Sequence, residues 1–262
     1  MTPPLVYVLP VHNEAQDLAT NVTRLAAYLA GFPGSEIYLC ENGSKDDSWR
    51  ISQELEALSV AARARPGDSS ARVRAYREPI GGIGHGLHRG MSEAIGRFGA
   101  DPNIWTVIQG ADLPFGFSDV EAARVPLQRS PSRILMGSKA HPRSKTAATA
   151  TRKVMSAVYR LARRAAIGMR VGDSQGSVFT RLDLAAVIGP KIKTRGFFYT
   201  TELCYYAEQE GETIVELPVV LNADRRASTV RPFDDGLAMA KELMRLRRER
   251  GGRARGGSRT DP

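Results

Sequence analysis

Short apolar runs alternate with amphipathic stretches in the first part of the chain. The run Leu5–Leu9 ends at Pro10, and a helical pattern of apolar residues follows it to about Gly31. A second run, Glu36–Cys40, ends in a polar turn, after which a further helical pattern begins near Asp46. Because strand, turn and helix repeat in this order, the pattern predicts βαβ units and a parallel sheet with right-handed crossovers.

The run Ile104–Ile108 gives the clearest strand signal. It is continuous, rich in β-branched residues, and stops at Gln109-Gly110 before Pro114. Such a run is typical of a strand that is buried on both faces of a parallel sheet. Asp112 follows it closely, in the position where open α/β sheets bind ligands. Asp112 could therefore hold a metal ion or a phosphate-bearing ligand, or it could only cap the following turn.

The same alternation continues through the rest of the chain. The segment His141–Thr151 is polar and rich in small residues, and we expect it to be mobile. Residues 249–262 are basic and of low complexity, with nothing to bury, and predict a disordered tail. The further elements that the pattern predicts are strands at Val73–Arg77, Arg133–Gly137, Val178–Thr180 and Thr213–Pro218, and helices through Met91, over Thr200–Glu210 and from about Asp235 to Arg248.

An apolar stripe at helical spacing lies in the second half of the chain. It is formed by Val154, Val158, Leu161 and Ala165, and basic residues surround it. The pattern favours a helix that packs on the core over one that lies on a membrane surface.

Composition narrows the class of protein. The chain has 262 residues, enough for one large α/β domain or two small ones, and its 42% hydrophobic and 25% charged residues are typical of soluble globular proteins. Two cysteines, Cys40 and Cys204, fit a reducing compartment, and no signal peptide or membrane span is visible, so we expect a cytoplasmic protein. The net charge of +9 favours anionic partners: nucleic acid, an acidic membrane face or phosphorylated small molecules.

Four polar or glycine-rich segments follow predicted strands and should meet at one edge of the sheet: Pro10–Glu14, Glu41–Ser44, Gly81–Gly86 and Gly110–Asp112. The glycine-rich turn would let backbone amides approach a diphosphate, although a plain loop explains it equally well. It lacks the Lys-Ser/Thr of a P-loop and does not lie in the first βα turn, which argues against an ATPase and a Rossmann dehydrogenase. The four histidines lack the spacing of a zinc site, and no nucleic-acid-binding motif is visible.

Seven strings of residues follow one another from about Leu5 to Val219. They are VLPVHNEAQDL at Val8–Leu18, CENGSKDDSW at Cys40–Trp49, GGIGHGLHRGMSEA at Gly81–Ala94, QGADLPF at Gln109–Phe115, MGSKAHPRSKT at Met136–Thr146, GDSQGSVFTR at Gly172–Arg181 and TTELCYYAEQEGETIVELPV at Thr200–Val219. Together they resemble the inverting, sugar-nucleotide-dependent glycosyltransferases of the family 2 type, and are most similar to the branch that makes dolichyl-phosphate glucose or dolichyl-phosphate mannose. The resemblance implies an α/β fold: a GT-A-like, Rossmann-type nucleotide-sugar-binding domain whose central, mostly parallel sheet is flanked by helices.

The resemblance also implies a layout for the donor site. A single domain would span residues 1–248, with a nucleotide half at about 1–115 and an acceptor half at about 116–248, ahead of the tail at 249–262. Glu41 matches the acidic residue that binds the base or ribose, and Gly82, Gly84 and His85 would pass beside the nucleotide. The other residues that would line the nucleoside pocket are Pro10, His12, Glu14 and Ser44.

A divalent metal, Mg²⁺ or Mn²⁺, is implied by the same resemblance. Asp112 matches the second acid of the family's Asp-x-Asp motif, which holds the metal on the sugar diphosphate. The first acid is replaced by Gly110. Because one carboxylate is a poor metal site, metal use is in doubt, although such ions usually keep waters and substrate phosphates as ligands.

The resemblance gives candidate residues for the acceptor as well. Lys139 and Arg152 match basic positions that bind the acceptor phosphate in the lipid-phosphate branch, and both could equally be surface residues. Asp173 and Gln175 match the string that follows the acceptor helix. Asp173 could act as a base toward a hydroxyl acceptor or orient Arg152 toward a phosphate, and Glu202 is a further candidate acid for the site or a solvent-facing helix residue.

The function that follows from the resemblance is transfer of a hexose, with inversion, from a UDP- or GDP-sugar to a polyprenyl (dolichyl-like) phosphate. Two alternatives stay open: the same transfer to a soluble hydroxyl acceptor, and a catalytically silent sugar-nucleotide-binding protein, which Gly110 would suggest. The expected partners are the nucleotide-sugar donor, a polyprenyl phosphate or small-molecule acceptor, and the cytoplasmic membrane face through basic helices, without nucleic acid.

Overall fold

The computed structural model places the backbone of residues 2–63, 69–146, 150–221 and 232–256, and describes the side chains of 2–62, 69–146, 154–221 and 238–250. Its contacts divide the chain into two units. Unit 1 comprises Met1–Thr146 and Asp173–Asn222, and unit 2 comprises Ala147–Gly172 and Ala223–Pro262. The predicted division into a nucleotide half and an acceptor half stays a prediction.

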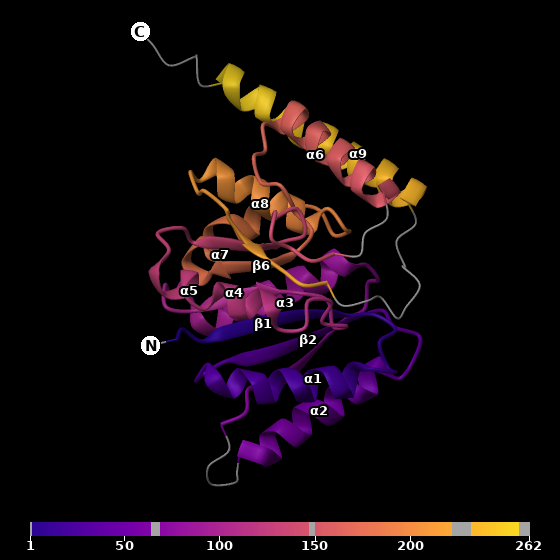
Figure 1. Cartoon of the computed structure of the whole chain (residues 1–262). Coiled ribbons are helices and arrows are strands. Elements are labelled where there is room, and N and C mark those ends of the chain that lie inside the picture. The colour runs from indigo at the N-terminus through magenta and orange to yellow at the C-terminus, as the bar shows by residue number, and fades with distance from the viewer. Residues whose placement is uncertain (1, 64–68, 147–149, 222–231, 257–262) are drawn as a thin grey trace. The chain divides into compact units, whose positions relative to one another are not determined.

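Unit 1 contains a seven-stranded sheet with the order β3-β2-β1-β4-β6-β5-β7 (Figure 1). All of its described strand pairs are parallel except those of β6, which runs antiparallel to both β4 and β5. The predicted α/β architecture with a central, mostly parallel sheet is therefore confirmed. The strands are β1 (Leu5–Val11), β2 (Glu36–Asn42), β3 (Arg72–Glu78), β4 (Trp105–Ile108), β5 (Ile134–Ser138), β6 (Ser177–Arg181) and β7 (Val215–Pro218).

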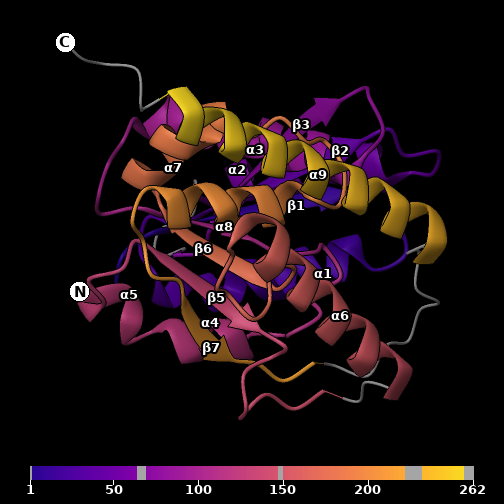
Figure 2. The same ribbon diagram turned by 90° about the horizontal axis from the view of Figure 1, so that it is seen from above.

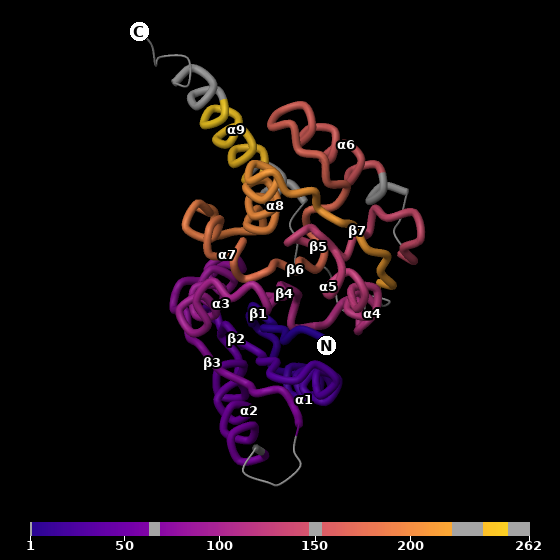
Figure 3. The backbone as a smooth tube through the Cα atoms, turned by 90° about the vertical axis from the view of Figure 1, so that its left-hand side faces the viewer, coloured from indigo at the N-terminus to yellow at the C-terminus, as the bar shows by residue number. Residues whose placement is uncertain are grey.

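Helices cover both faces of this sheet, and Figure 3 shows α1 and α3 on opposite sides of β1 and β2. The main core lies on the face covered by α1, α2, α4 and α5. Every residue of β1 is buried, as a central strand of a parallel sheet requires. The helices of unit 1 are α1 (Leu18–Tyr28), η1 (Leu29–Gly31), α2 (Ser48–Arg63), α3 (Ile83–Phe98), α4 (Ser118–Ala123), α5 (Pro126–Arg129), α7 (Leu182–Ile188), η2 (Gly189–Lys191) and α8 (Tyr199–Gln209).

Unit 2 consists of two long helices, α6 (Ala150–Ile167) and α9 (Pro232–Gly256), which pack against each other (Figures 1 and 2). The predicted last helix was expected to end near Arg248, but α9 continues to Gly256. Helix therefore replaces disorder over the first part of the predicted tail, while residues 257–262 lie outside the described residues. None of the helices in the described part of the chain has the length and apolar character needed to span a bilayer.

The apolar stripe of α6 does not pack on the core. Val154 and Val158 are each 62% exposed, and Leu161 is 68% exposed. The predicted core-packing role is therefore wrong, because a periodic pattern identifies an apolar face without fixing which way that face turns.

The segment after β5 is also more ordered than expected. The Ser144 amide donates to the His141 carbonyl at 2.9 Å, and the Lys145 amide donates to the Val219 carbonyl at 2.8 Å. Lys145 forms a parallel bridge with Val220. These backbone bonds hold this segment against the residues that follow β7, so the predicted mobility is wrong for residues 141–146, while residues 147–149 lie outside the described residues.

Candidate functional site

The carboxyl ends of β1, β2, β3 and β4 meet at one edge of the sheet because these strands are parallel neighbours. The loops that leave β1 and β2 are joined by hydrogen bonds. The His12 Nδ1 lies 2.9 Å from the Asn42 carbonyl oxygen, the Asn13 amide donates to Ser44 Oγ at 3.1 Å, and the Glu14 amide donates to Ser48 Oγ at 2.8 Å. The predicted meeting of the first two strand ends is therefore present. Pro10 lies within β1 and is buried beneath these loops.

Glu41 and Asn42 end β2 as a pair of buried polar side chains. Glu41 is 1% exposed and accepts a hydrogen bond from the Ser44 amide through Oε1. Its Oε2 has no hydrogen-bond partner in the described structure, and Arg77 Nε lies 3.5 Å away as an ion pair. The Asn42 Oδ1 is likewise buried and unpaired. Buried polar atoms without partners are rare, so these two indicate a place where a ligand or water binds.

Arg77 is a site residue that the sequence did not single out. It lies at the end of β3, and its guanidinium group lies 5.5 Å from the centre of the Trp49 ring while it pairs with Glu41. An exposed cation on an aromatic face can hold a flat, polar ring or a phosphate beside it. The feature of the sequence that could have identified Arg77 is its position just before the glycine-rich turn.

The glycine-rich turn packs against a second loop. A Cβ at Gly84 would stand 2.6 Å from both the Arg195 Cα and its carbonyl oxygen. Only glycine therefore fits at Gly84 without displacing the loop that contains Arg195. Gly82, with φ of 132°, is the N-cap that precedes α3, and the His85 amide donates back to its carbonyl at 2.9 Å.

Glu202 holds this second loop in place. It is fully buried in the first turn of α8, and it accepts hydrogen bonds from the Lys193 amide at 3.2 Å and the Thr194 amide at 2.9 Å. Its visible role is thus to fix the loop that rests on Gly84. A direct contact of Glu202 with a ligand stays a prediction.

One turn of α3 beyond His85, the His88 side chain lies partly buried beside this loop. Burial lowers the pKa of His88, and the positive charges of Arg195 and His85 lower it further. The imidazole is therefore neutral near pH 7 and can accept a proton or a hydrogen bond.

The turn after β4 aims Asp112 outward. The Leu113 amide donates to the Gly110 carbonyl at 3.0 Å, and Leu113 has a positive φ of 48°. That conformation is strained for leucine, but its side chain is buried in the core and holds the turn in shape. Asp112 is exposed at the tip, and Gln109 behind it is 4% exposed with neither atom of its amide group paired in the described structure.

The donor set at this turn fits a metal only together with a substrate. No group of three or more His, Cys, Asp or Glu side chains suited to a metal occurs among the described residues. A Cβ at Gly110 would overlap Asp112 Oδ1, so the carboxylate of Asp112 fills the space of the missing first acid. One carboxylate can hold Mg²⁺ or Mn²⁺ when substrate phosphates and waters supply the other ligands.

Lys139 and Asp173 lie together at the same edge, on the far side of β4. Lys139 follows β5, and Asp173 precedes the antiparallel β6, so both stand at the carboxyl edge. The Lys139 amide donates to Asp173 Oδ2 at 2.9 Å, the two charged groups are 3.5 Å apart, and Lys139 Nζ donates to the Gln175 carbonyl at 2.7 Å. The Gln175 amide donates to Asp173 Oδ1 at 2.9 Å. These three predicted residues therefore form one cluster.

Glu216 supports this cluster and was missed in the sequence. It accepts hydrogen bonds from Ser138 Oγ and, at 3.2 Å, from the Asp173 amide. A charged residue within the otherwise apolar strand β7 was the signal that could have found it. Arg152, the other predicted acceptor residue, lies in the first turn of α6, and its side chain is outside the described ones.

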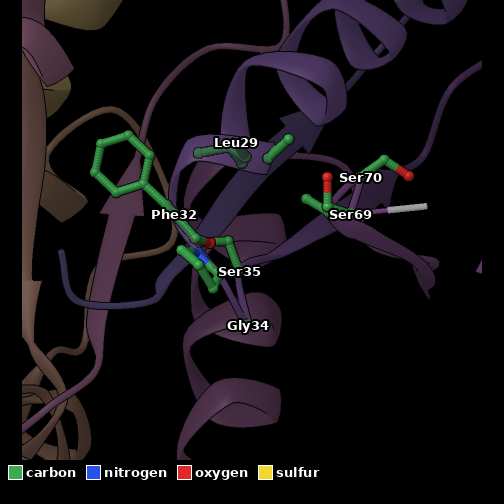
Figure 4. Close-up of a pocket in the computed structure, with 9 residues that line it drawn as sticks. Leu29, Phe32, Gly34, Ser35, Ser69 and Ser70 are labelled. Carbon is green, nitrogen blue, oxygen red and sulfur yellow. The ribbon is translucent and has the colours of Figure 1, made fainter. Parts of the chain in front are cut away.

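A pocket of about 140 Å³ lies elsewhere, between the segments that lead into β2 and β3 (Figure 4). Its lining includes Phe32, Ser35 and Ser70. Because these residues precede the strands, the pocket opens at the amino edge of the sheet, opposite the site.

The family model for glycosyl transferase family 2 matches residues 7–183, which is more than half of the chain. The chain belongs to glycosyl transferase family 2. The expected class of enzyme, a sugar-nucleotide-dependent glycosyltransferase with a GT-A-like fold, is thereby confirmed, while the resemblance to the dolichyl-phosphate branch stays a prediction.

Solved structures of glucosyl-3-phosphoglycerate synthase from Mycobacterium tuberculosis are similar in fold to this family 2 glycosyltransferase. The complex with UDP is 16% identical with a TM-score of 0.57, and the match covers 95% of this chain and 80% of that one. The complex with Mn²⁺ and UDP-glucose is 16% identical with a TM-score of 0.60, covering 93% and 77%. The complex with Mn²⁺, UDP and glucosyl-3-phosphoglycerate is 16% identical with a TM-score of 0.59, and the match covers 92% of this chain and 77% of that one. No curated protein sequence is significantly similar to the chain.

Proposed function

We propose that this family 2 glycosyltransferase moves a hexose, with inversion, from a UDP- or GDP-sugar to a polyprenyl phosphate. The observation that carries the donor part is the set of buried polar atoms without a hydrogen bond at the carboxyl edge: Glu41 Oε2, which has only the ion pair with Arg77, Asn42 Oδ1 and the Gln109 amide. Each would cost about 1–3 kcal/mol if it stayed unpaired. A bound nucleotide sugar would satisfy them.

The donor would lie across the ends of β2, β1 and β4. Glu41 and Asn42 would accept from the base or ribose, and Arg77 on Trp49 would flank the base. Because the fold neighbours were solved with UDP and UDP-glucose, UDP-glucose is the first donor to test. His12, Glu14 and Ser44 would contribute through the bonded loops that shape the pocket.

Asp112 would hold a divalent metal on the donor diphosphate. When bound, the metal would offset negative charge on the diphosphate group as it leaves. Asp112 is exposed at the end of its turn, which lets it reach a ligand outside the sheet.

The acceptor would bind at Lys139. In the reaction, an acceptor oxygen forms a bond to the anomeric carbon while the bond from that carbon to the diphosphate oxygen breaks, and the nucleoside diphosphate leaves with the electron pair. A hydroxyl acceptor needs a base, whereas a phosphate is already an anion. Both oxygens of Asp173 accept backbone hydrogen bonds, and Lys139 lies beside it, so Asp173 is poorly placed to take a proton. This favours a phosphate acceptor.

The test is transfer from radiolabelled UDP-glucose, UDP-galactose, GDP-mannose and GDP-glucose, with and without Mn²⁺, to a polyprenyl phosphate. Label in the organic phase supports the proposal. Label that reaches only a water-soluble acceptor supports the soluble alternative, and nucleotide binding without turnover supports a silent binder. Lys139→Ala should raise the acceptor KM by about tenfold or more and leave the donor affinity within about twofold. Equal loss of both would contradict the assigned role.

Gly110→Asp tests the metal assignment. The variant restores the missing first carboxylate of the motif, and the tip of Asp112 can rotate to make room. We expect Mn²⁺ to bind about tenfold more tightly in the presence of UDP, as measured by calorimetry, because a second anionic ligand replaces a water. Gly110→Asn is the matched control, and an equal gain in that variant would show that charge is not the cause.

A further inference from the structure

Helix α6 is turned with its apolar face outward. Val154, Met155, Val158 and Leu161, called the α6 stripe below, are 62%, 53%, 62% and 68% exposed. On the opposite side of the helix, Arg163 is only 2% exposed. A helix of a globular protein normally has the reverse arrangement, with apolar residues buried and arginine in water.

The buried arginine fixes this orientation from within unit 2. Arg163 donates to the Val171 carbonyl at 3.3 Å and to the Gly172 carbonyl at 3.1 Å, and its Nη1 lies 3.4 Å from Met169 Sδ. Its guanidinium group also lies 5.1 Å from the centre of the Tyr159 ring. These contacts tie Arg163 to the chain that follows α6, so the stripe cannot turn inward without breaking them.

The charge of α6 indicates what covers the stripe. The helix sequence contains five basic residues and no acidic one, and Arg160 and Arg164 are exposed beside the stripe. A second copy would bring these cations against one another, which is unfavourable. A bilayer with anionic lipids offers hydrocarbon for the stripe and phosphates for the arginines.

We propose that the α6 stripe and its flanking arginines lie on an anionic lipid surface. This inference rests on the proposed function, in which the acceptor is a membrane lipid. It names the surface through which the enzyme would bind the membrane that contains this acceptor. The binding itself does not depend on the transfer reaction, so the two can fail separately.

The test is sedimentation of the full chain with vesicles of phosphatidylcholine alone and of phosphatidylcholine mixed with phosphatidylglycerol, without sugar nucleotide. We expect binding to the mixed vesicles and little to the neutral ones. Val158→Glu/Leu161→Glu should lower the partition coefficient by about tenfold or more, since two charges must enter the interface. The matched control is Leu58→Glu/Val60→Glu in α2, where the same types of exposed apolar residue, 65% and 53% exposed, lie away from the stripe.

A second variant covers the case in which the glutamate pair disturbs folding. Arg160→Gln/Arg164→Gln removes exposed charge only, and should bind mixed vesicles more weakly while circular dichroism and calorimetric UDP affinity stay unchanged. Equal vesicle binding by wild type and both α6 variants would overturn the proposal. So would a wild-type dimer that the stripe variant converts to a monomer, because a second copy would then cover the stripe. Vesicle binding without any transfer to lipid would leave this inference standing and contradict the proposed acceptor.

Discussion

Asp119 is a fully buried carboxyl group in α4, close to side chains from the sheet. Burial raises the pKa of Asp119 to about 6, although the nearby Ser177 side chain and the hydrogen bond from the Val120 amide lower it. The Asp119 Oδ2 has no hydrogen-bond partner in the described structure, and burial together with the charge of Asp119 raises the pKa of Tyr7 in β1. Gly137 leaves room for the Asp119 side chain, since a Cβ at position 137 would lie 3.3 Å from the Asp119 Cβ.

Asp119→Asn should change how stability depends on pH. The carboxyl keeps its proton in the folded state up to about pH 6, but loses it near 3.8 in the unfolded chain, so wild-type stability falls as pH rises between these values. The full loss is about 3 kcal/mol. The neutral amide avoids it, and we expect the variant to be about 1–3 kcal/mol more stable than wild type at about pH 8, with no gain at about pH 4, in urea unfolding.

A control with the opposite sign is available in Asp183. Hydrogen bonds from Arg181 lower the pKa of Asp183, so its contribution to stability is present at neutral pH and lost on acidification. Asp183→Asn should therefore lose stability at neutral pH. An Asp119→Asn variant with the wild-type pH profile would show that the Asp119 carboxyl is not desolvated in the folded protein.

Gly84→Ala should disturb the contact between the glycine-rich turn and the Arg195 loop. The added methyl group would meet backbone atoms that cannot rotate away, so we expect a loss of about 1–3 kcal/mol in thermal unfolding. Gly96 is the control, because it lies in the same helix and an added Cβ has no neighbour within 4 Å. Gly96→Ala should stabilise by about 0.5–1 kcal/mol. Equal effects at both positions would contradict the close approach.

At this scale the sequence identified residues that directly follow strands and missed those placed by contacts between loops. The positions of Glu41 and Asp112 could be predicted because a parallel sheet brings strand ends to one edge, whereas Lys139 was singled out by the family resemblance alone. The burial of Glu202 could not, because its hydrogen-bond donors belong to a loop without periodic pattern.

At the scale of elements, α6 depends on Arg163 for its orientation. Arg163→Met keeps the length of the side chain but leaves the Val171 and Gly172 carbonyls without this donor. We expect the free energy of local unfolding of α6 to fall by about 1–3 kcal/mol. It should appear as faster amide hydrogen exchange across α6, while β1 and β2 stay protected.

Arg160→Met is the matched control for that prediction. Arg160 is exposed in the same helix, so its replacement should change the opening free energy measured by hydrogen exchange by no more than about 0.5 kcal/mol. If both variants exchanged alike, Arg163 would not be the residue that orients α6.

The positions of the elements were predictable, but some of their directions were not. The strand at Thr213–Pro218 and the helix at Thr200–Glu210 appear within two residues of their predicted ends. The antiparallel direction of β6 is set by the path of the chain between strands. Similarly, the exposure of the α6 stripe depends on the buried Arg163. The hydrophobic pattern could not reveal this, because an arginine in such a pattern is expected on the exposed face.

On the scale of the whole molecule, the residues of unit 1 that we propose to bind the donor and the acceptor lie far apart along one edge of the sheet. The strand order separates the end of β2, with Glu41, from the end of β5, with Lys139, by four strand spacings. At about 4.8 Å for each spacing, the separation is about 19 Å. Groups that far apart and without shared partners should act independently.

Glu41→Gln and Lys139→Ala should therefore have additive effects on catalysis. We expect each to lower kcat/KM by about ten- to hundredfold, about 1.4–2.7 kcal/mol. The double variant should match the sum of the two losses within about 0.5 kcal/mol, measured with the donor and acceptor that the panel identifies. A clear departure from additivity would mean that the two residues contact one shared group.

The fold class was predictable from the order of strands and helices, because βαβ units leave few topologies. The division into two units was not. It depends on α6 packing with α9, and these helices are separated in the chain by β6, α7, η2, α8 and β7.

The strands β5 and β6 form an unusual hairpin. Gly137 and Ser177 are paired neighbours, and the whole stretch between them, which contains α6, leaves and re-enters the sheet at the same place. The hydrogen bond from the Lys139 amide to Asp173 joins the two ends of this stretch where it leaves and returns to the sheet. The length and composition of this stretch can thus change without altering β1, β2 or β4, at whose ends we propose that the donor binds. If the proposed acceptor role of Lys139 and Asp173 holds, a graft of the corresponding stretch from a relative with another acceptor should exchange the acceptor and keep the donor.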